Sequence, residues 1–310
     1  MYDTITFWLD SRLHNLPDAE EVCSCLSNRR QEVDRETGDI VLKGDFRNLK
    51  VKAGWKGILI KNSLARFHYG SNACVLTRGD TEEAIKELSD CLHLPISAAK
   101  VCRFDLAQNF IMQHPVKDYL SRMSQVRYFR KSEYSDRQSL LFENGLRAIA
   151  VYDKGRQLAK AHKEIPDLFK GKNVLRYEYR FMRRLGKQFK REQVIGADLY
   201  DEIFYKRALD KWEQSYFLIQ KVRKGKAICM HDVKSFIKSL AFYGIENIGG
   251  VDVALDLVKG AKARGEIQKQ TYYRLMDAIK EVAIQKEKSE SSDIIEELDS
   301  KVRQAVACYR

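Results

Sequence analysis

Three segments of the chain alternate charged and apolar side chains, which is the pattern of a β-strand with one polar face. Their polar faces carry Arg103 and Asp105 in residues 101–107, Tyr152 and Lys154 in residues 147–154, and Arg176, Glu178 and Arg180 in residues 174–182. If these strands are neighbours in one sheet, two carboxylates, a tyrosine, a lysine and three arginines share a surface. Such a surface suits the chemistry of a phosphodiester.

Each of these residue types has a role in that chemistry. Asp105 and Glu178 offer hard oxygen ligands for Mg²⁺ or Mn²⁺, which would act as a Lewis acid on the phosphate. Tyr152 is the candidate nucleophile, and Lys154 on the same face, with the metal, would favour its phenolate. Three arginines would each bind two oxygens of a phosphate, namely Arg103, Arg176 and Arg180. The alternative is an ordinary solvent-facing sheet surface with cross-strand pairs of Arg and Glu.

The distribution of charge points to a nucleic acid partner. The chain has 55 Lys and Arg residues against 43 Asp and Glu residues, a net charge of +12, and residues 116–195 alone hold twenty basic and nine acidic residues. Tyrosines and phenylalanines are interleaved with the basic residues of this block, which include Arg127, Arg130 and Lys131. Basic groups bind phosphates and aromatic rings stack on unpaired bases, so we expect DNA binding here. A solvated, lysine-rich surface is the alternative.

The composition excludes several other classes of protein. With 310 residues, 44% of them hydrophobic, the chain can bury a core in one or two domains, so a disordered protein is excluded. No apolar stretch approaches the roughly 18–20 residues of a membrane span. Met1–Asp10 lacks the pattern of a secretory signal, so we expect a cytoplasmic protein without a membrane partner. Seven scattered cysteines without a C-x-x-C pair predict reduced thiols and no zinc site.

The elements that would position the candidate residues form an α+β domain over residues 1–195. Alternation and turn residues predict antiparallel strands, and Asp80 followed by Glu83 predicts a capped helix that stops before Pro95. The expected strands are residues 40–42, 49–51, 57–60, 64–69, 101–107, 139–142, 147–153 and 174–182, with further helices at 18–28 and 115–123.

Residues 196–310 are expected to form a helical domain. The helices are predicted at 197–222, 230–243, 251–263, 269–285 and 292–307. Residues 251–282, with a turn at Gly265, are compatible with a helix-turn-helix whose second helix enters a major groove. The alternative is a small bundle that packs on the first domain or on a second subunit. The last helix is expected to dock or to form a homodimer.

The three charged segments resemble those of a known family. The segments Val101–Asp105, Ala150–Lys154 and Leu175–Glu178, in this order, are similar to the filamentous-phage gene II replication initiator and its plasmid relatives, the phage/plasmid replication protein II/X family. The plasmid initiators of the Rep_trans group are more distantly similar. Two further stretches, Met1–Ile5 and Ser63–Asn72, support the resemblance, which covers about residues 1–210.

The resemblance implies an antiparallel-sheet rolling-circle initiator, a metal-dependent endonuclease that nicks and closes one DNA strand at an origin of replication. Tyr152 would form a 5′-phosphotyrosyl intermediate and release a 3′-OH that primes a polymerase, while Asp105 and Glu178 would hold Mg²⁺ or Mn²⁺. Its partners would be single-stranded or supercoiled origin DNA and the host helicase and polymerase.

The sequence departs from the family pattern at Gln157, where the gene II protein has a glutamate five residues after the tyrosine. The His-hydrophobe-His motif of many other initiators is absent, so we expect a carboxylate metal site. Two alternatives remain at this stage. One is a non-catalytic origin-binding protein that uses the basic block, and the other is a mobilisation relaxase with the same chemistry.

Overall fold

A large antiparallel sheet carries the candidate residues. The computed structural model describes residues 1–310 except 34–37, 72, 135–137, 163, 222–231 and 288–293. Within the described residues the sheet has ten strands in the order β2-β3-β4-β5-β1-β6-β10-β9-β8-β7. These are β1 (Tyr2–Asp10), β2 (Ser27–Val33), β3 (Ile40–Phe46), β4 (Leu49–Gly54), β5 (Gly57–Ser63), β6 (Lys100–Met112), β7 (Arg130–Tyr134), β8 (Ser139–Glu143), β9 (Arg147–Asp153) and β10 (Asn173–Phe181). The expected α+β class with an antiparallel sheet is therefore confirmed.

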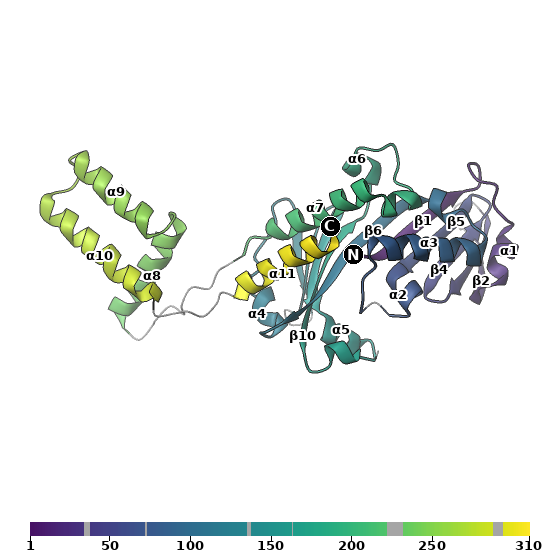
Figure 1. Ribbon diagram of the computed structural model, residues 1–310, viewed down its shortest axis with the longest axis horizontal. Helices are drawn as coiled ribbons and strands as arrows, with labels where there is room; N and C mark the ends of the chain where they lie inside the picture. The colour runs from purple at the N-terminus through teal and green to yellow at the C-terminus, as the bar shows by residue number, and fades with distance from the viewer. Residues whose placement is uncertain (34–37, 72, 135–137, 163, 222–231, 288–293) are drawn as a thin grey trace. The chain divides into compact units, whose positions relative to one another are not determined.

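Helices lie over the apolar face of this sheet (Figure 1), whereas α5 (Lys154–Lys160) lies at the polar face beside Tyr152. The helices of the sheet unit are α1 (Ala19–Ser24), α2 (Leu64–Tyr69), α3 (Arg78–Leu92), α4 (Val116–Leu120), α5 (Lys154–Lys160), α6 (Leu185–Phe189), α7 (Glu202–Phe217) and α11 (Ile294–Tyr309). Phe104 of β6 stacks on Phe181 of β10 with ring centroids 4.5 Å apart, and Phe189 of α6 packs on Phe204 of α7 at the same separation. Because side chains alternate along a strand, the polar side chains of β6 and β10 point to the other face.

Two local predictions were wrong, for reasons that capping explains. Residues 64–69, expected as a strand, form helix α2, because the Ser63 hydroxyl accepts a hydrogen bond from the backbone N–H of Arg66 and Gly70 ends the helix in the left-handed conformation. Helix α3 begins before Asp80. Thr77 is its N-cap, and Asp80 is the third residue of a reciprocal capping box with Thr77.

The compact units divide the chain differently from the expected domains. One unit comprises Met1–Lys221 together with Glu297–Arg310, and the other comprises Val222–Glu296. Helix α7 lies beyond the expected boundary at residue 195, yet its Trp212 is fully buried against Tyr177 of β10. The end of the chain also returns to the sheet unit, where the Tyr216 hydroxyl donates a 2.6 Å hydrogen bond to Asp299 of α11.

The second unit is helical, as expected. It contains α8 (Val233–Asn247), α9 (Val251–Ala263) and α10 (Lys269–Glu287), and Gly265 takes a positive φ of 74° in the turn between α9 and α10. DNA reading by α10 stays a prediction. Six cysteines are free in the described part of the chain, while Cys229 lies outside it. In the same part, no helix has the length and apolar character needed to cross a membrane.

Candidate active site

The strand order brings the three charged segments together, as the sequence predicts. Strand β10 lies between β6 and β9. In its register Arg180 is opposite Asp105 of β6, and Arg176 is opposite Tyr152 of β9. The polar groups therefore share one face of three adjacent strands, with Glu178 in the middle.

Glu178 is the centre of the hydrogen-bond network. Its Oε1 accepts hydrogen bonds from the Tyr152 hydroxyl and from Arg176 Nε, both at 2.7 Å, and its Oε2 accepts from Arg180 Nη2 at 2.8 Å. Burial alone would raise the pKa of this carboxyl, but the charges of the two arginines and the hydrogen bonds outweigh burial and lower the pKa. Glu178 is therefore ionised.

Arg176 anchors this centre. Its side chain is fully buried and forms an ion pair with Asp3 of β1 as well as with Glu178, while its Nη1 donates to Asn109 Oδ1 at 3.1 Å. Asp3 also accepts a hydrogen bond from Ser63. Asp3 is a residue of the site that the sequence pattern did not predict. The alternation of apolar residues over Ile5–Leu9 marks β1 and was the signal that could have placed Asp3 in the sheet.

Asp105 is held by a different arginine. Arg103 Nε and Nη2 donate to its two carboxylate oxygens at 2.9 and 2.7 Å, and Arg180 Nε lies 3.9 Å from Oδ2. Burial raises the pKa of Asp105 to about 6, since it outweighs the lowering effect of Arg103. Of the two carboxyls assigned to a metal, Asp105 is thus the one that titrates near neutral pH.

The phenol of Tyr152 is neutral in this arrangement. Burial raises its pKa well above the ordinary value, and the charge of Glu178 raises it further. Lys154, expected at the end of the strand, instead follows it: β9 ends at Asp153, which caps α5 by accepting a hydrogen bond from the backbone N–H of Arg156. Lys154 is the first residue of α5, 1% exposed, and its Nζ donates to Gln157 Oε1 at 3.0 Å.

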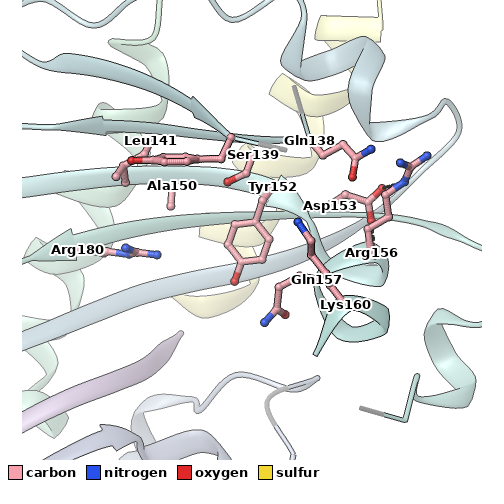
Figure 2. A pocket seen from close by; sticks show the side chains of 11 residues that line it. Gln138, Ser139, Leu141, Ala150, Tyr152, Asp153, Arg156, Gln157, Lys160 and Arg180 are labelled. Carbon is pink, nitrogen blue, oxygen red and sulfur yellow. Dashed lines mark hydrogen bonds and ion pairs between the residues drawn. The ribbon is translucent and has the colours of Figure 1, made fainter. Parts of the chain in front are cut away.

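A hollow of about 410 Å³ opens beside Tyr152. Figure 2 shows the ring of Tyr152 between Arg180 and the side chains at the start of α5. The lining residues are Tyr134, Gln138, Ser139, Leu141, Ala150, Tyr152, Asp153, Arg156, Gln157, Lys160 and Arg180. The candidate nucleophile therefore faces a space that admits another molecule.

The basic residues 127–131 do not all join this face. In the antiparallel register Arg130 of β7 is opposite Glu143, which is opposite Ala148, and Ala148 is opposite Arg180. Arg130 thus lies on the polar face, while Lys131 is opposite the buried Phe142 and shares the other face. Arg127 precedes β7, and its guanidinium lies 4.7 Å from the ring centroid of Tyr128.

Residues 1–199 match the family of the phage gene II replication-associated protein, N-terminal region. The chain belongs to this family. The resemblance to the phage gene II-like replication proteins is confirmed, and the matched region contains every strand of the sheet but ends before α7. No curated protein matches the chain.

The carboxylates fit a hard cation by their donor chemistry. Asp105 and Glu178 supply oxygen atoms, the ligands that Mg²⁺ and Mn²⁺ prefer. In the structure, however, their oxygens accept hydrogen bonds from Arg103, Arg176, Arg180 and Tyr152. A cation at this place would have to replace guanidinium groups, and the partly exposed side chains of Arg103 (35%) and Arg180 (29%) are the ones able to leave.

Proposed function

We propose that this member of the replication-associated family nicks and closes one strand of origin DNA through Tyr152, as a rolling-circle initiator. The observation that carries the proposal is the 2.7 Å hydrogen bond from the Tyr152 hydroxyl to Glu178, in a network of three arginines that faces an open hollow. Such a site combines a nucleophile, a proton acceptor and phosphate-binding cations.

The bonds exchanged in this reaction are those of a transesterification. The Tyr152 oxygen forms a bond to phosphorus as the bond from phosphorus to the 3′ oxygen breaks. The phenolic proton of Tyr152 passes to Glu178, and the departing 3′ oxygen takes up a proton from water. The products are a 5′-phosphotyrosyl link and a 3′-OH for a polymerase. The reverse reaction closes the strand.

The proton shift from Tyr152 to Glu178 is uphill before DNA binds. The pKa of the phenol is raised and that of the carboxyl is lowered, so the proton stays on the phenol. Proton transfer must therefore accompany bond formation to phosphorus, when the developing negative charge moves onto phosphate oxygens that Arg180 and Arg103 can bind.

A divalent cation is part of the proposal. Held by Asp105 and Glu178, it would supply Lewis-acid stabilisation of the phosphate. The arginines released from these carboxylates would then be available to bind phosphate oxygens, an exchange of one anionic partner for another. We therefore expect cation and DNA to enter the site together.

The direct test is formation of a covalent adduct. Labelled single-stranded oligonucleotides tiled over the intergenic DNA of the element that encodes this gene are incubated with the protein and Mg²⁺ or Mn²⁺, then resolved on a denaturing protein gel. We expect one oligonucleotide to label the protein, Tyr152→Phe to abolish the band, and Tyr128→Phe, an exposed tyrosine outside the site, to retain it. An adduct that persists in Tyr152→Phe would refute the assignment.

A second candidate function is DNA binding without catalysis. It is favoured by the hydrogen bonds that the two carboxylates already accept. Glu178 accepts them from two arginines and a tyrosine hydroxyl, and Asp105 accepts them from Arg103. It predicts salt-dependent binding to origin DNA that Asp105→Asn leaves unchanged, with no adduct. Loss of the adduct with intact binding in Asp105→Asn would exclude it.

A further inference from the structure

The hollow beside Tyr152 has a floor of small and apolar side chains. Across the three outer strands, Tyr134 of β7 is opposite Ser139 of β8, which is opposite Tyr152 of β9. In the next row Leu141 is opposite Ala150, which is opposite Glu178. Ala150 lines the hollow with only a methyl group, whereas the neighbouring Tyr152 lines it with a ring, so the small side chain leaves room there.

The walls of the hollow carry groups that match a nucleobase. Tyr134 is 53% exposed and offers an aromatic face on which a base can stack. Gln138, Gln157 and Ser139 offer amide and hydroxyl groups that can pair with the donors and acceptors on the edge of a base. The volume of about 410 Å³ falls in the range of pockets for small molecules.

Gln157 is held in place for such a contact. Its Oε1 accepts the 3.0 Å hydrogen bond from the buried Lys154, so the amide is oriented with its NH₂ group at the other end. Figure 2 shows the side chain of Gln157 below the ring of Tyr152 and that of Lys160 beside it. The lysine that the sequence places next to the nucleophile thus orients a residue of the hollow.

The rim of the hollow is cationic. Arg156 and Lys160 lie at one side on α5, and Arg180 lies at the other side on β10. Among the described residues that line the hollow, Asp153 is the acidic one, and it caps α5 and lies 3.8 Å from Arg156 Nε. A nucleotide within a strand fits this combination better than an anionic or purely apolar ligand does, because its base is a neutral aromatic ring and its sugar is linked to a phosphate on each side.

We propose that the hollow is a nucleobase pocket, which receives a base of single-stranded DNA flipped out next to the phosphate that reacts with Tyr152. The base stacks on Tyr134 and pairs with Gln157, while Arg156, Lys160 and Arg180 bind the flanking phosphates. The identity of the bound strand rests on the proposed nicking function. The pocket gives the site a means to select the nucleotide at the nick.

The test is a scan with abasic oligonucleotides. The oligonucleotide that forms the adduct, or the tightest binder of the tiled set if none does, is synthesised with one base removed at each position in turn. Affinity is measured by fluorescence anisotropy with the Tyr152→Phe protein, which cannot react. We expect removal of one base to weaken binding about tenfold, since stacking on an aromatic side chain contributes roughly 1–3 kcal/mol per base.

Variants connect this loss to the pocket. Tyr134→Ala and Gln157→Ala, each made in the Tyr152→Phe protein, should weaken binding of the intact oligonucleotide and should reduce the effect of the abasic position to less than about twofold. Ala150→Leu should do the same by filling the space. The matched control is Trp55→Ala, because Trp55 is a 63% exposed aromatic residue outside both the hollow and the basic block.

The outcomes separate this inference from the proposed function. A flat abasic scan, or equal effects of Tyr134→Ala and Trp55→Ala, overturns the pocket even if wild-type protein forms the Tyr152 adduct. A position-specific abasic effect that disappears in Tyr134→Ala supports the pocket. If the same protein forms no adduct with any oligonucleotide, the pocket is still supported but the proposed nicking function is refuted.

Discussion

Replacement of Arg176 by methionine is expected to destabilise the protein strongly. The guanidinium is fully buried and faces Asp3 and Glu178, each only 5% exposed, and also donates to Asn109. Methionine would leave two buried carboxylates without their shared counter-charge, and breaking a buried ion pair from one side costs about 3–5 kcal/mol. For a unit of this size that loss lowers Tm by about 6–20 °C.

The dependence of this loss on pH tests the reasoning. In the wild-type protein the pKa of Glu178 is lowered, so its contribution to stability is present above the ordinary pKa of 4.5 and disappears as the pH falls through its folded value. Without Arg176 this pKa should be higher, because one of the two arginine charges that oppose the effect of burial is gone. The difference in unfolding free energy between the two proteins should therefore be largest near neutral pH and should shrink as the pH falls towards about 4.

Denaturant unfolding followed by tryptophan fluorescence, to which the fully buried Trp212 of α7 contributes, measures both quantities. Arg180→Met serves as the control, because its side chain is 29% exposed and its loss should be smaller. A loss below about 1 kcal/mol in Arg176→Met, the range of exposed ion pairs, or a loss that does not change with pH would refute the assignment of Arg176 as the buried counter-ion.

Three further predictions concern neighbouring groups. Adduct formation should rise as the pH increases through about 6, because the pKa of Asp105 lies near 6 and its carboxylate is the required form; a flat profile from acid to neutral pH would contradict this role. Arg103→Gln should raise the affinity for Mn²⁺ several-fold in electron paramagnetic resonance titrations by freeing the oxygens of Asp105, and unchanged affinity would exclude the exchange. Ser63→Ala should lower the unfolding free energy by about 1–2 kcal/mol, since Ser63 caps α2 and donates to Asp3, whereas the exposed Ser11→Ala should have little effect.

Strand periodicity predicted the core of the site because it is a local property. Alternation assigned Arg103, Asp105 and Glu178 to one kind of face, and the register of β6, β10 and β9 confirms that they share it. The same rule assigned Lys154 to the strand, because periodicity does not show where a strand ends. The strand ends at Asp153 because its side chain is the N-cap of α5, so that the next residue, Lys154, is the first of the helix.

Long-range partners were beyond the reach of sequence reasoning. Nothing local to Asp3 indicates that it pairs with Arg176, which lies far along the chain and meets it only because β1 and β10 both flank β6. The boundary of the sheet unit was missed for the same reason. Helix α7 is amphipathic like any surface helix, and only the structure shows that Trp212 packs on Tyr177.

The three arginines of the site divide into two roles by their burial. Arg176 is inaccessible and holds Glu178, which accepts a hydrogen bond from the Tyr152 hydroxyl, so Arg176 would position the candidate nucleophile without meeting DNA. Arg103 and Arg180 are partly exposed, and phosphate oxygens can replace the carboxylate oxygens that they now bind. Substitution of the outer pair should therefore weaken DNA binding and its dependence on salt while the fold persists, whereas substitution of Arg176 should act first on stability. Under the proposed function, the sheet thus separates the charge that keeps the site assembled from the charges that would be exchanged when DNA enters.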